Sequence, residues 1–168
     1  MKRPLFIVFS FMALLGFSFA ADPLPVGAAA PTVSGPADDG STVNFAEVYA
    51  SHDYTLVYFY PKADTPGCTK QGCSLRDAYE ELTDRGVAVL GVSHDSVDAQ
   101  RAFKKKYQFP FTLIADTEKV VSTAFGAKGL MMAARQAYLV HDGKIVYADH
   151  QGSTIKQAED ILNFLASK

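Results

Sequence analysis

The 168-residue chain has little cysteine and little net charge. It contains only two cysteines, Cys68 and Cys73, and its formal net charge is −2. A charge this small gives no indication of a nucleic acid or an anionic membrane as a partner. A disulfide between cysteines five positions apart would close a very small loop, so its chain-entropy contribution to stability would be modest. We therefore expect the two thiols to serve chemistry rather than to staple the fold.

The chain has one long apolar run, and it lies at the N-terminus, over residues 5–19 behind a short basic start. This run is shorter than the roughly 20 residues that a membrane-spanning helix needs. Small residues at Ser18 and Ala20 fit the pattern that signal peptidase reads. We predict that residues 1–20 are a signal peptide and that the mature protein is exported, to the periplasm in a Gram-negative bacterium. No cysteine lies at the cleavage site, so a lipoprotein is not expected; an uncleaved anchor is the alternative.

The rest of the chain shows neither repeats nor an internal domain boundary. Residues 21–42, rich in Pro, Ala and Gly, predict a loosely structured segment with an edge hairpin around 32–42, and residues 43–168 predict one domain. Apolar and β-branched runs alternate there with helical patterns, and Asp142-Gly143 is a strong two-residue hairpin signal. This order predicts an α/β, thioredoxin-like fold with a central mixed sheet flanked by helices. The expected strands are 55–60, 87–93, 111–115, 137–141 and 144–149, and the expected helices are 74–84, one capped by Asp95 or Ser96 and ending before Pro110, 118–125 and 155–165.

Both cysteines follow a buried strand, at the point where a Pro/Gly-broken loop becomes a helix. The unpaired N–H groups at a helix N-terminus and the positive end of the helix dipole favour a thiolate over a thiol there. Pro61, Thr65 and Cys68 have the spacing P-x-x-x-T-x-x-C. This pattern indicates a reactive thiol at Cys68.

Three segments carry a resemblance to a known family: VYFYPKADTPGCTKQGCSLRD, GVSHDSVDAQRAFKKKYQFPFTLIAD and RQAYLVHDGKIV. Over roughly residues 43–165 the chain resembles the peroxiredoxin Q branch of the peroxiredoxins, also called bacterioferritin comigratory protein. The resemblance implies a thiol-dependent peroxidase that reduces hydrogen peroxide and organic hydroperoxides. It also implies antioxidant defence without a metal or other cofactor, and re-reduction by a thioredoxin-like or other dithiol donor.

The resemblance also implies a role for each site residue. Cys68 would attack the peroxide and become a sulfenic acid, and Cys73 would resolve it as an intramolecular disulfide. Arg135 would lie beside the Cys68 thiolate, Thr65 would donate to a peroxide oxygen, and Pro61 would shield the thiolate. The alternatives are that Arg135 is a solvated cation at a strand end, and that Pro61 and Thr65 only make a turn and a helix cap.

The spacing of the two thiols leads to a geometric expectation. Five helical steps place two Cα atoms roughly 8–9 Å apart, whereas a disulfide needs about 4.4–6.8 Å. If both cysteines are helical when reduced, the first turn must unwind before the bond can form. Gly67 and Gly72 would ease that unwinding.

Other readings remain open from the residues alone. A thioredoxin-like disulfide oxidoreductase normally uses C-x-x-C, which this chain lacks. An exported copper chaperone would use Cys68, Cys73 and a histidine as soft ligands.

Residues 130–132 (Leu-Met-Met) predict core packing, or else an apolar rim for organic hydroperoxides or for the reductant. His94 is expected to be a polar surface residue. Because the resolving thiol is intramolecular, we expect a monomer.

Overall fold

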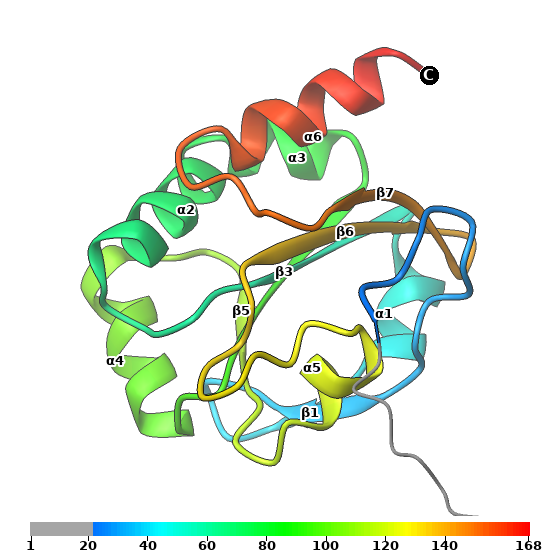
Figure 1. The fold of residues 1–168 in the computed structure, drawn as a ribbon. Helices are drawn as coiled ribbons and strands as arrows, with labels where there is room; N and C mark the ends of the chain where they lie inside the picture. Colours follow the sequence, from blue (N-terminus) through cyan, green and yellow to red (C-terminus); the bar gives the residue numbers. More distant parts are fainter. Residues whose placement is uncertain (1–21) are drawn as a thin grey trace, which may run out of the picture.

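A five-stranded mixed β-sheet with helices on both faces forms the centre of the protein (Figure 1). The computed structural model describes residues 22–168, so the predicted signal peptide lies outside the described residues. The strand order is β5-β4-β3-β6-β7, in which β3 pairs in parallel with β4 and antiparallel with β6. The elements are β1 (Ser34–Pro36), β2 (Thr42–Asn44), α1 (Phe45–Ser51), β3 (Tyr54–Phe59), α2 (Pro66–Asp77), α3 (Tyr79–Asp84), β4 (Val87–Ser93), α4 (Val97–Tyr107), β5 (Thr112–Ala115), α5 (Val120–Ala124), β6 (Gln136–His141), β7 (Lys144–Asp149) and α6 (Gln157–Ala166).

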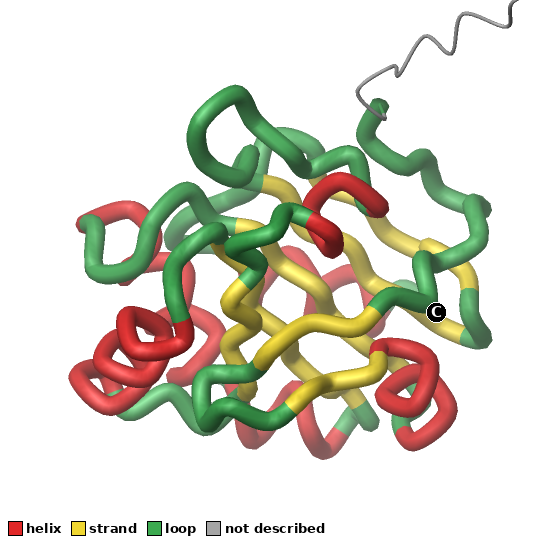
Figure 2. The backbone as a smooth tube through the Cα atoms, turned by 90° about the horizontal axis from the view of Figure 1, so that it is seen from below, coloured by secondary structure: helices red, strands yellow, loops and turns green. Residues whose placement is uncertain are grey.

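The central strand β3 explains why both faces of the sheet are covered. Successive side chains of a strand point to opposite faces, and from Leu56 to Phe59 the side chains on both faces are hydrophobic and fully buried. Leu56 and Tyr58 join the core beneath α2, α3 and α6, whereas Val57 and Phe59 join the core on the side of α1 and α5. Figure 2 shows the strands side by side across the middle of the molecule. The predicted thioredoxin-like α/β fold is confirmed.

The hairpin expected at Asp142-Gly143 is present between β6 and β7. Both turn residues are in the left-handed region, with φ of 48° at Asp142 and 69° at Gly143. A two-residue turn of this kind matches the twist of the strands that it joins. The local sequence signal was therefore sufficient at this position.

Residues 22–42, predicted to be a loosely structured segment, are hydrogen-bonded to the main sheet. The backbone N–H of Gly27 donates to Ile145 at 2.8 Å and that of Ala30 donates to Gly143 at 2.8 Å, which fastens the segment to the edge of β7. Farther on, the expected hairpin is present as β1 paired antiparallel with β2. The partners of Gly27 and Ala30 lie more than a hundred residues farther along the chain, so local composition does not reveal these two contacts.

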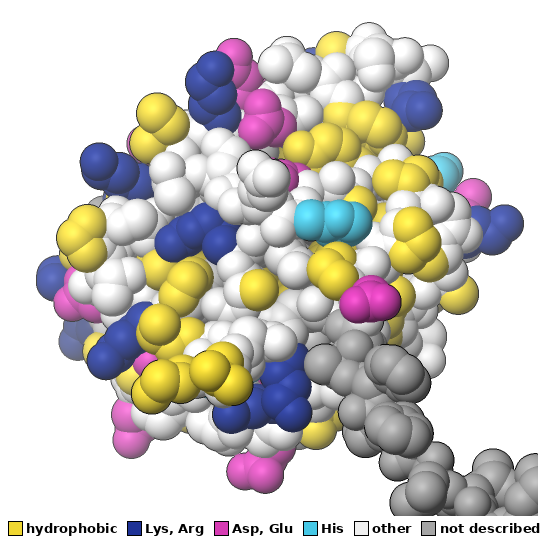
Figure 3. All heavy atoms as spheres, in the orientation of Figure 1, with side chains coloured by type: hydrophobic (Ala, Val, Ile, Leu, Met, Phe, Trp, Pro, Cys, Tyr) yellow, Lys and Arg dark blue, Asp and Glu magenta, His cyan; other side chains and the backbone are white. Residues whose placement is uncertain are grey.

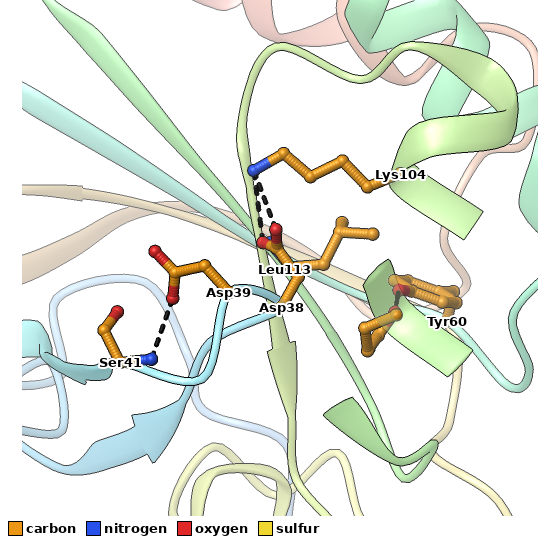
Figure 4. A network of polar contacts seen from close by, with 7 residues as sticks. Asp38, Asp39, Ser41, Tyr60, Lys104 and Leu113 are labelled. Atoms are coloured by element: carbon orange, nitrogen blue, oxygen red, sulfur yellow. Dashed lines mark hydrogen bonds and ion pairs between the residues drawn. The ribbon is translucent and has the colours of Figure 1, made fainter. Parts of the chain in front are cut away.

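A buried carboxylate holds the same segment to the other edge of the sheet. Asp38 is 5% exposed and accepts from the backbone N–H of Leu113 in β5 at 2.8 Å. Lys104 of α4 reaches the same carboxylate at 3.0 Å (Figure 4). A buried charge is tolerated when it is paired and hydrogen-bonded in this way.

The helix predicted over 74–84 is two helices, and its start lies earlier. Helix α2 begins at Pro66 and includes both cysteines, and the path breaks at Ala78 before α3. At the C-terminus α6 begins at Gln157, two residues after the predicted start, and Ile155 is 66% exposed. Among residues 22–168 no helix has the length and apolar character needed to cross a membrane.

Candidate active site

Cys68 lies in the first turn of α2, directly after Pro66 and Gly67. Proline suits the first helical position because it lacks an N–H group that would have no helical partner. The first helical bond described runs from Thr69 N to the carbonyl of Thr65 at 2.8 Å, so the N–H groups before Thr69 are available to an anion. The Cys68 side chain is only 1% exposed. The thiol is thus held in a place that is poor in water and attractive to negative charge.

Arg135 contacts this thiol. Its Nη2 lies 3.4 Å from Cys68 Sγ, and its Nη1 donates to Oε1 of Gln71, one turn farther along α2. The sheet explains the meeting, because Phe59 pairs with Gln136 where β3 ends and β6 begins. The structure therefore places Arg135 beside Cys68, as the resemblance implied, and not in solvent at a strand end.

Two glycines make room for the arginine. A Cβ at Gly67 would lie 3.2 Å from Arg135 Nη2, and a Cβ at Gly152 would lie 2.3 Å from Arg135 Cγ. Gly152 also has a φ of 57°, which disfavours other residues. The loop after β7 and the start of α2 thus enclose Arg135 from two sides and restrict where its guanidinium can go.

The loop between β3 and α2 is anchored by a chain of polar contacts that runs from half-buried Asp95 to buried Ser93 and Gln100. The N–H of Ala63 donates to Asp95 Oδ2 at 2.7 Å, and Ser93 Oγ donates to the same oxygen at 2.7 Å. Gln100 of α4 donates to Ser93 at 2.9 Å and accepts from the hydroxyl of Tyr60. Burial raises the pKa of Tyr60, so its hydroxyl stays protonated as a donor. The network fixes the loop that precedes Cys68.

The same loop has a second, solvent-facing anchor at Asp64. Its carboxylate accepts from Lys106 at 2.7 Å and from the hydroxyl of Tyr107 at 2.6 Å. These hydrogen bonds, with Lys106 first, lower the pKa of the Asp64 carboxyl. Because the group is exposed, this anchor contributes less to stability than the buried one.

Thr65 and Pro61 lie in this loop, both half-buried. The Thr65 hydroxyl donates to the carbonyl of Lys62 at 3.0 Å and makes no side-chain cap to α2. The proton is therefore in use, and the hydroxyl oxygen is left to accept. This differs from the expected donation to a peroxide. Thr65 is the N-cap residue of α2, as the alternative held, but its side chain makes no capping hydrogen bond.

Cys73 is half-buried on the same helix, and both cysteines are free. Since α2 spans Pro66–Asp77, both thiols are helical in this state. Because both cysteines are helical when reduced, a Cys68–Cys73 bond requires the first part of α2 to change its path, as the spacing predicts. Gly72 has a packing role here as well, because a Cβ on it would lie 2.5 Å from the ring of Phe109.

Gln71 and Asp95 are site residues that the sequence reasoning missed. Gln71 is 0% exposed and follows Cys68 by three positions, with Leu75 four positions later on the same buried face. This spacing puts a polar residue on the inner face of a helix, a signal that could have identified Gln71 from the sequence. The sequence indicates a helix cap at Asp95 or Ser96, and in the structure Ser96 caps α4 by accepting from Ala99 N at 3.3 Å.

Residues 130–132 are not in the core. Leu130 is 98% exposed, Met131 81% and Met132 49%, so the expectation of core packing is wrong. They form a turn closed by the bridge between Lys128 and Ala133, shortly before Arg135 in the chain. Figure 3 shows hydrophobic side chains gathered beside Lys and Arg side chains at the lower left, where Figure 1 draws this loop. We call residues 130–132 the apolar tip.

The remaining residues offer little support for a metal site. In the part of the chain that the structure describes, no group of three or more His, Cys, Asp and Glu side chains is placed to hold a metal ion. His94 is half-buried, and its Nε2 lies 2.9 Å from Ser122 Oγ, so it is less exposed than expected.

Comparisons with known proteins agree with this geometry. A family model described as AhpC/TSA matches residues 26–148. Peroxiredoxin Bcp of Escherichia coli strain K12 is 37% identical over 153 residues, covering 86% of this chain and 97% of that protein. Chloroplastic peroxiredoxin Q of Suaeda salsa is 36% identical over 135 residues, covering 77% of this chain and 62% of that protein.

Solved structures agree as well. Peroxidoxin BcpB of Mycobacterium tuberculosis superposes with a TM-score of 0.80 at 27% identity, covering 84% of this chain and 96% of that one. Peroxiredoxin Q of Xanthomonas campestris gives 0.76 at 27% identity, covering 86% and 96%. The chain belongs to the AhpC/TSA family and is a peroxiredoxin of the Bcp/peroxiredoxin Q type, a thiol-dependent peroxidase.

Proposed function

We propose that Cys68 is the peroxidatic nucleophile and that Arg135 is the group that orients and stabilises its thiolate. The observation that carries this proposal is the 3.4 Å approach of Arg135 Nη2 to Cys68 Sγ. An arginine stays charged and presents several donors in a fixed fork. It can therefore bind the thiolate and a peroxide oxygen with different N–H groups.

In the first step the Cys68 thiolate attacks one oxygen of R–O–O–H. The S–O bond forms as the O–O bond breaks, and Cys68 becomes a sulfenic acid. The departing R–O⁻ takes a proton from solvent and leaves as water or an alcohol. Donors fixed around the site stabilise charge on that oxygen. The Thr65 oxygen can accept the peroxide O–H, since its own proton is given to Lys62, and Pro61 shields the thiolate.

In the second step Cys73 resolves the sulfenic acid. Cys68–S–OH and Cys73–S–H give a Cys68–Cys73 disulfide and one water molecule, after α2 has opened. An external dithiol then reduces the disulfide and becomes a disulfide itself. Because this cycle needs no second subunit, we propose that the protein acts as a monomer.

The sequence of the N-terminus supports export, with residues 1–20 as a cleaved signal peptide, and the periplasm as destination in a Gram-negative bacterium. The reductant is then an extracytoplasmic thioredoxin-like protein, since export separates the enzyme from cytosolic donors. Intact-mass analysis of protein recovered from the periplasmic fraction tests this. A chain that still carries residues 1–20, or that stays in the cytosol, would contradict export.

Peroxide consumption by the reduced protein tests the catalytic proposal. One equivalent of hydroperoxide should be consumed per chain, and Cys68→Ser should abolish the reaction. Cys73→Ser should still consume the first equivalent and stop as the sulfenic acid, which mass spectrometry and a sulfenic-acid trap detect. Reactivity retained in Cys68→Ser would overturn the assignment.

A further inference from the structure

A buried pair of glutamine side chains joins α2 to α6, and nothing in the proposed reaction uses it. Gln71 Nε2 donates to Gln157 Oε1 at 2.9 Å. Both side chains are 0% exposed. Hydrogen bonds shielded from water in this way resist exchange with solvent, and breaking them is costly when no new partner is found.

Gln71 is held at both ends of its amide. Its Oε1 accepts from Arg135 Nη1 while its Nε2 donates to Gln157. It lies on α2 between Cys68 and Cys73, within the stretch that must change its path before the two sulfurs can meet. Opening of that stretch therefore breaks two hydrogen bonds of one side chain.

Gln157 is on the side that does not have to move. It begins α6, next to Ala158 and near Ile161, which pack into the core. Its Nε2 has no hydrogen-bond partner among the described residues. When Gln71 leaves, the Gln157 amide is left buried with neither group paired, which disfavours the open state.

We propose that Gln157 is a positioning residue that holds Gln71, and through it α2, in the closed helical arrangement, and so slows closure of the Cys68–Cys73 disulfide. This inference rests on the proposed function, in which Cys73 resolves the Cys68 sulfenic acid with release of water. Gln157 takes no part in bond making or breaking. It sets how long the sulfenic acid persists before resolution.

That lifetime has a chemical consequence. A second hydroperoxide can meet the waiting sulfenic acid and convert Cys68–S–OH and R–O–O–H to the sulfinic acid and R–O–H. A longer closed state gives this reaction more time. Gln157 thus adjusts the balance between recycling of Cys68 and its overoxidation.

The test uses Gln157→Met, which keeps an unbranched side chain of similar length without the amide. Reduced protein receives one equivalent of hydrogen peroxide and is quenched with a thiol-alkylating reagent at increasing times. Mass spectrometry then counts free thiols. Disulfide formation should be about fivefold faster than in the wild type, the shift expected from loss of one net hydrogen bond in the closed state. Consumption of the first equivalent of peroxide should stay within about twofold, and the sulfinic fraction at excess peroxide should fall.

Ser74→Ala is the matched control. Ser74 Oγ accepts from Ala158 N at 3.2 Å, so this variant also loses one bond between α2 and α6, but outside the stretch between the two thiols. Its rate of disulfide formation should stay near that of the wild type. An equal acceleration in Ser74→Ala would overturn the specific role of the amide pair.

Two further results decide the outcome. Gln157→Ala removes the same acceptor with a side chain small enough to fit the site. If Gln157→Met folds poorly, Gln157→Ala must still form the Cys68–Cys73 disulfide faster than the wild type. An unchanged or slower disulfide step in both variants overturns the inference. Failure of the proposed function looks different, because the wild type itself would then form no Cys68–Cys73 disulfide.

Discussion

Arg135 Nη2 lies 3.4 Å from Cys68 Sγ although 67 positions separate the two residues in the chain. The pairing of Phe59 with Gln136 in the sheet brings the end of β3 to the start of β6, and the site lies just beyond that pair. The contact is thus set by strand register and by two glycines that leave room for the guanidinium. A change in the strand register or at either glycine should therefore displace the Arg135 guanidinium.

Removal of the arginine should slow the first step. In Arg135→Met we expect the rate constant for reaction with hydrogen peroxide to fall by about 10²-fold, as when one preorganised donor to developing charge is lost. Arg135→Lys should lose less, because the charge remains while the fork is gone. Competition kinetics against a reporter peroxidase measures both. Arg101→Met is the control, since within residues 22–168 Arg101 forms an ion pair only with exposed Asp98. Wild-type reactivity in Arg135→Met would contradict the assignment.

Gly152→Ala should displace Arg135 through direct contact. The new Cβ would lie 2.3 Å from Arg135 Cγ, and the positive φ adds strain of about 1–2 kcal/mol. Gly143→Ala carries the same kind of strain, with a φ of 69° and no neighbour within 4 Å. Urea unfolding should show that both variants lose stability. Only Gly152→Ala should also lose peroxide reactivity. Equal reactivity in the two variants would show that the loop containing Gly152 does not position Arg135 for the reaction.

The fold was predictable where the signal is local. The buried run of β3, the P-x-x-x-T-x-x-C spacing and the Asp142-Gly143 turn each determine their structure within a few residues. The thioredoxin-like order follows from these elements in sequence. The position of Arg135 came from family resemblance, since no local pattern links it to Cys68.

What was missed depends on contacts between distant segments. Residues 22–42 looked loose by composition, yet Asp38 is paired with Lys104 and bonded to Leu113. Gln71 and Gln157 are polar, and only the packing of α2 on α6 shows that they are buried. Conversely, the apolar character of residues 130–132 suggested the core, whereas a tight turn presents them to solvent.

Asp95 should matter for the loop before Cys68. In Asp95→Ala the N–H of Ala63 and the hydroxyl of Ser93 both lose their acceptor. We expect a loss of about 1–3 kcal/mol in unfolding free energy and a slower reaction with peroxide, because the loop is no longer held. Asp95→Asn keeps an acceptor and should lose less. The control is Asp98→Ala, whose side chain is 91% exposed; an equal effect there would show that Asp95 has no special role.

His94 should make stability depend on pH. Burial lowers the pKa of His94 below its ordinary value of 6.5, so the folded state binds its proton less readily than the unfolded state. Stability from this group is full above about 6.5 and falls as the pH drops below that value. Unfolding free energies at pH 7.5 and 5.5 should therefore differ less in His94→Gln than in the wild type. An unchanged difference in His94→Gln would contradict the prediction.

The apolar tip should affect bulky substrates and little else. Leu130 and Met131 are 98% and 81% exposed, so replacing both with serine should change unfolding free energy by less than about 0.5 kcal/mol. Reduction of hydrogen peroxide should also stay the same, because neither side chain contacts the buried thiol. The tip precedes Arg135 by only a few residues and offers apolar surface to an organic group, so the rate with cumene hydroperoxide should fall relative to hydrogen peroxide. Val26→Ser, at a position 62% exposed, controls for loss of surface hydrophobicity. If the ratio of the two rates is unchanged in the double variant, the apolar tip does not contact the substrate. A higher KM for the dithiol donor in that variant would instead show that the apolar tip binds the reductant.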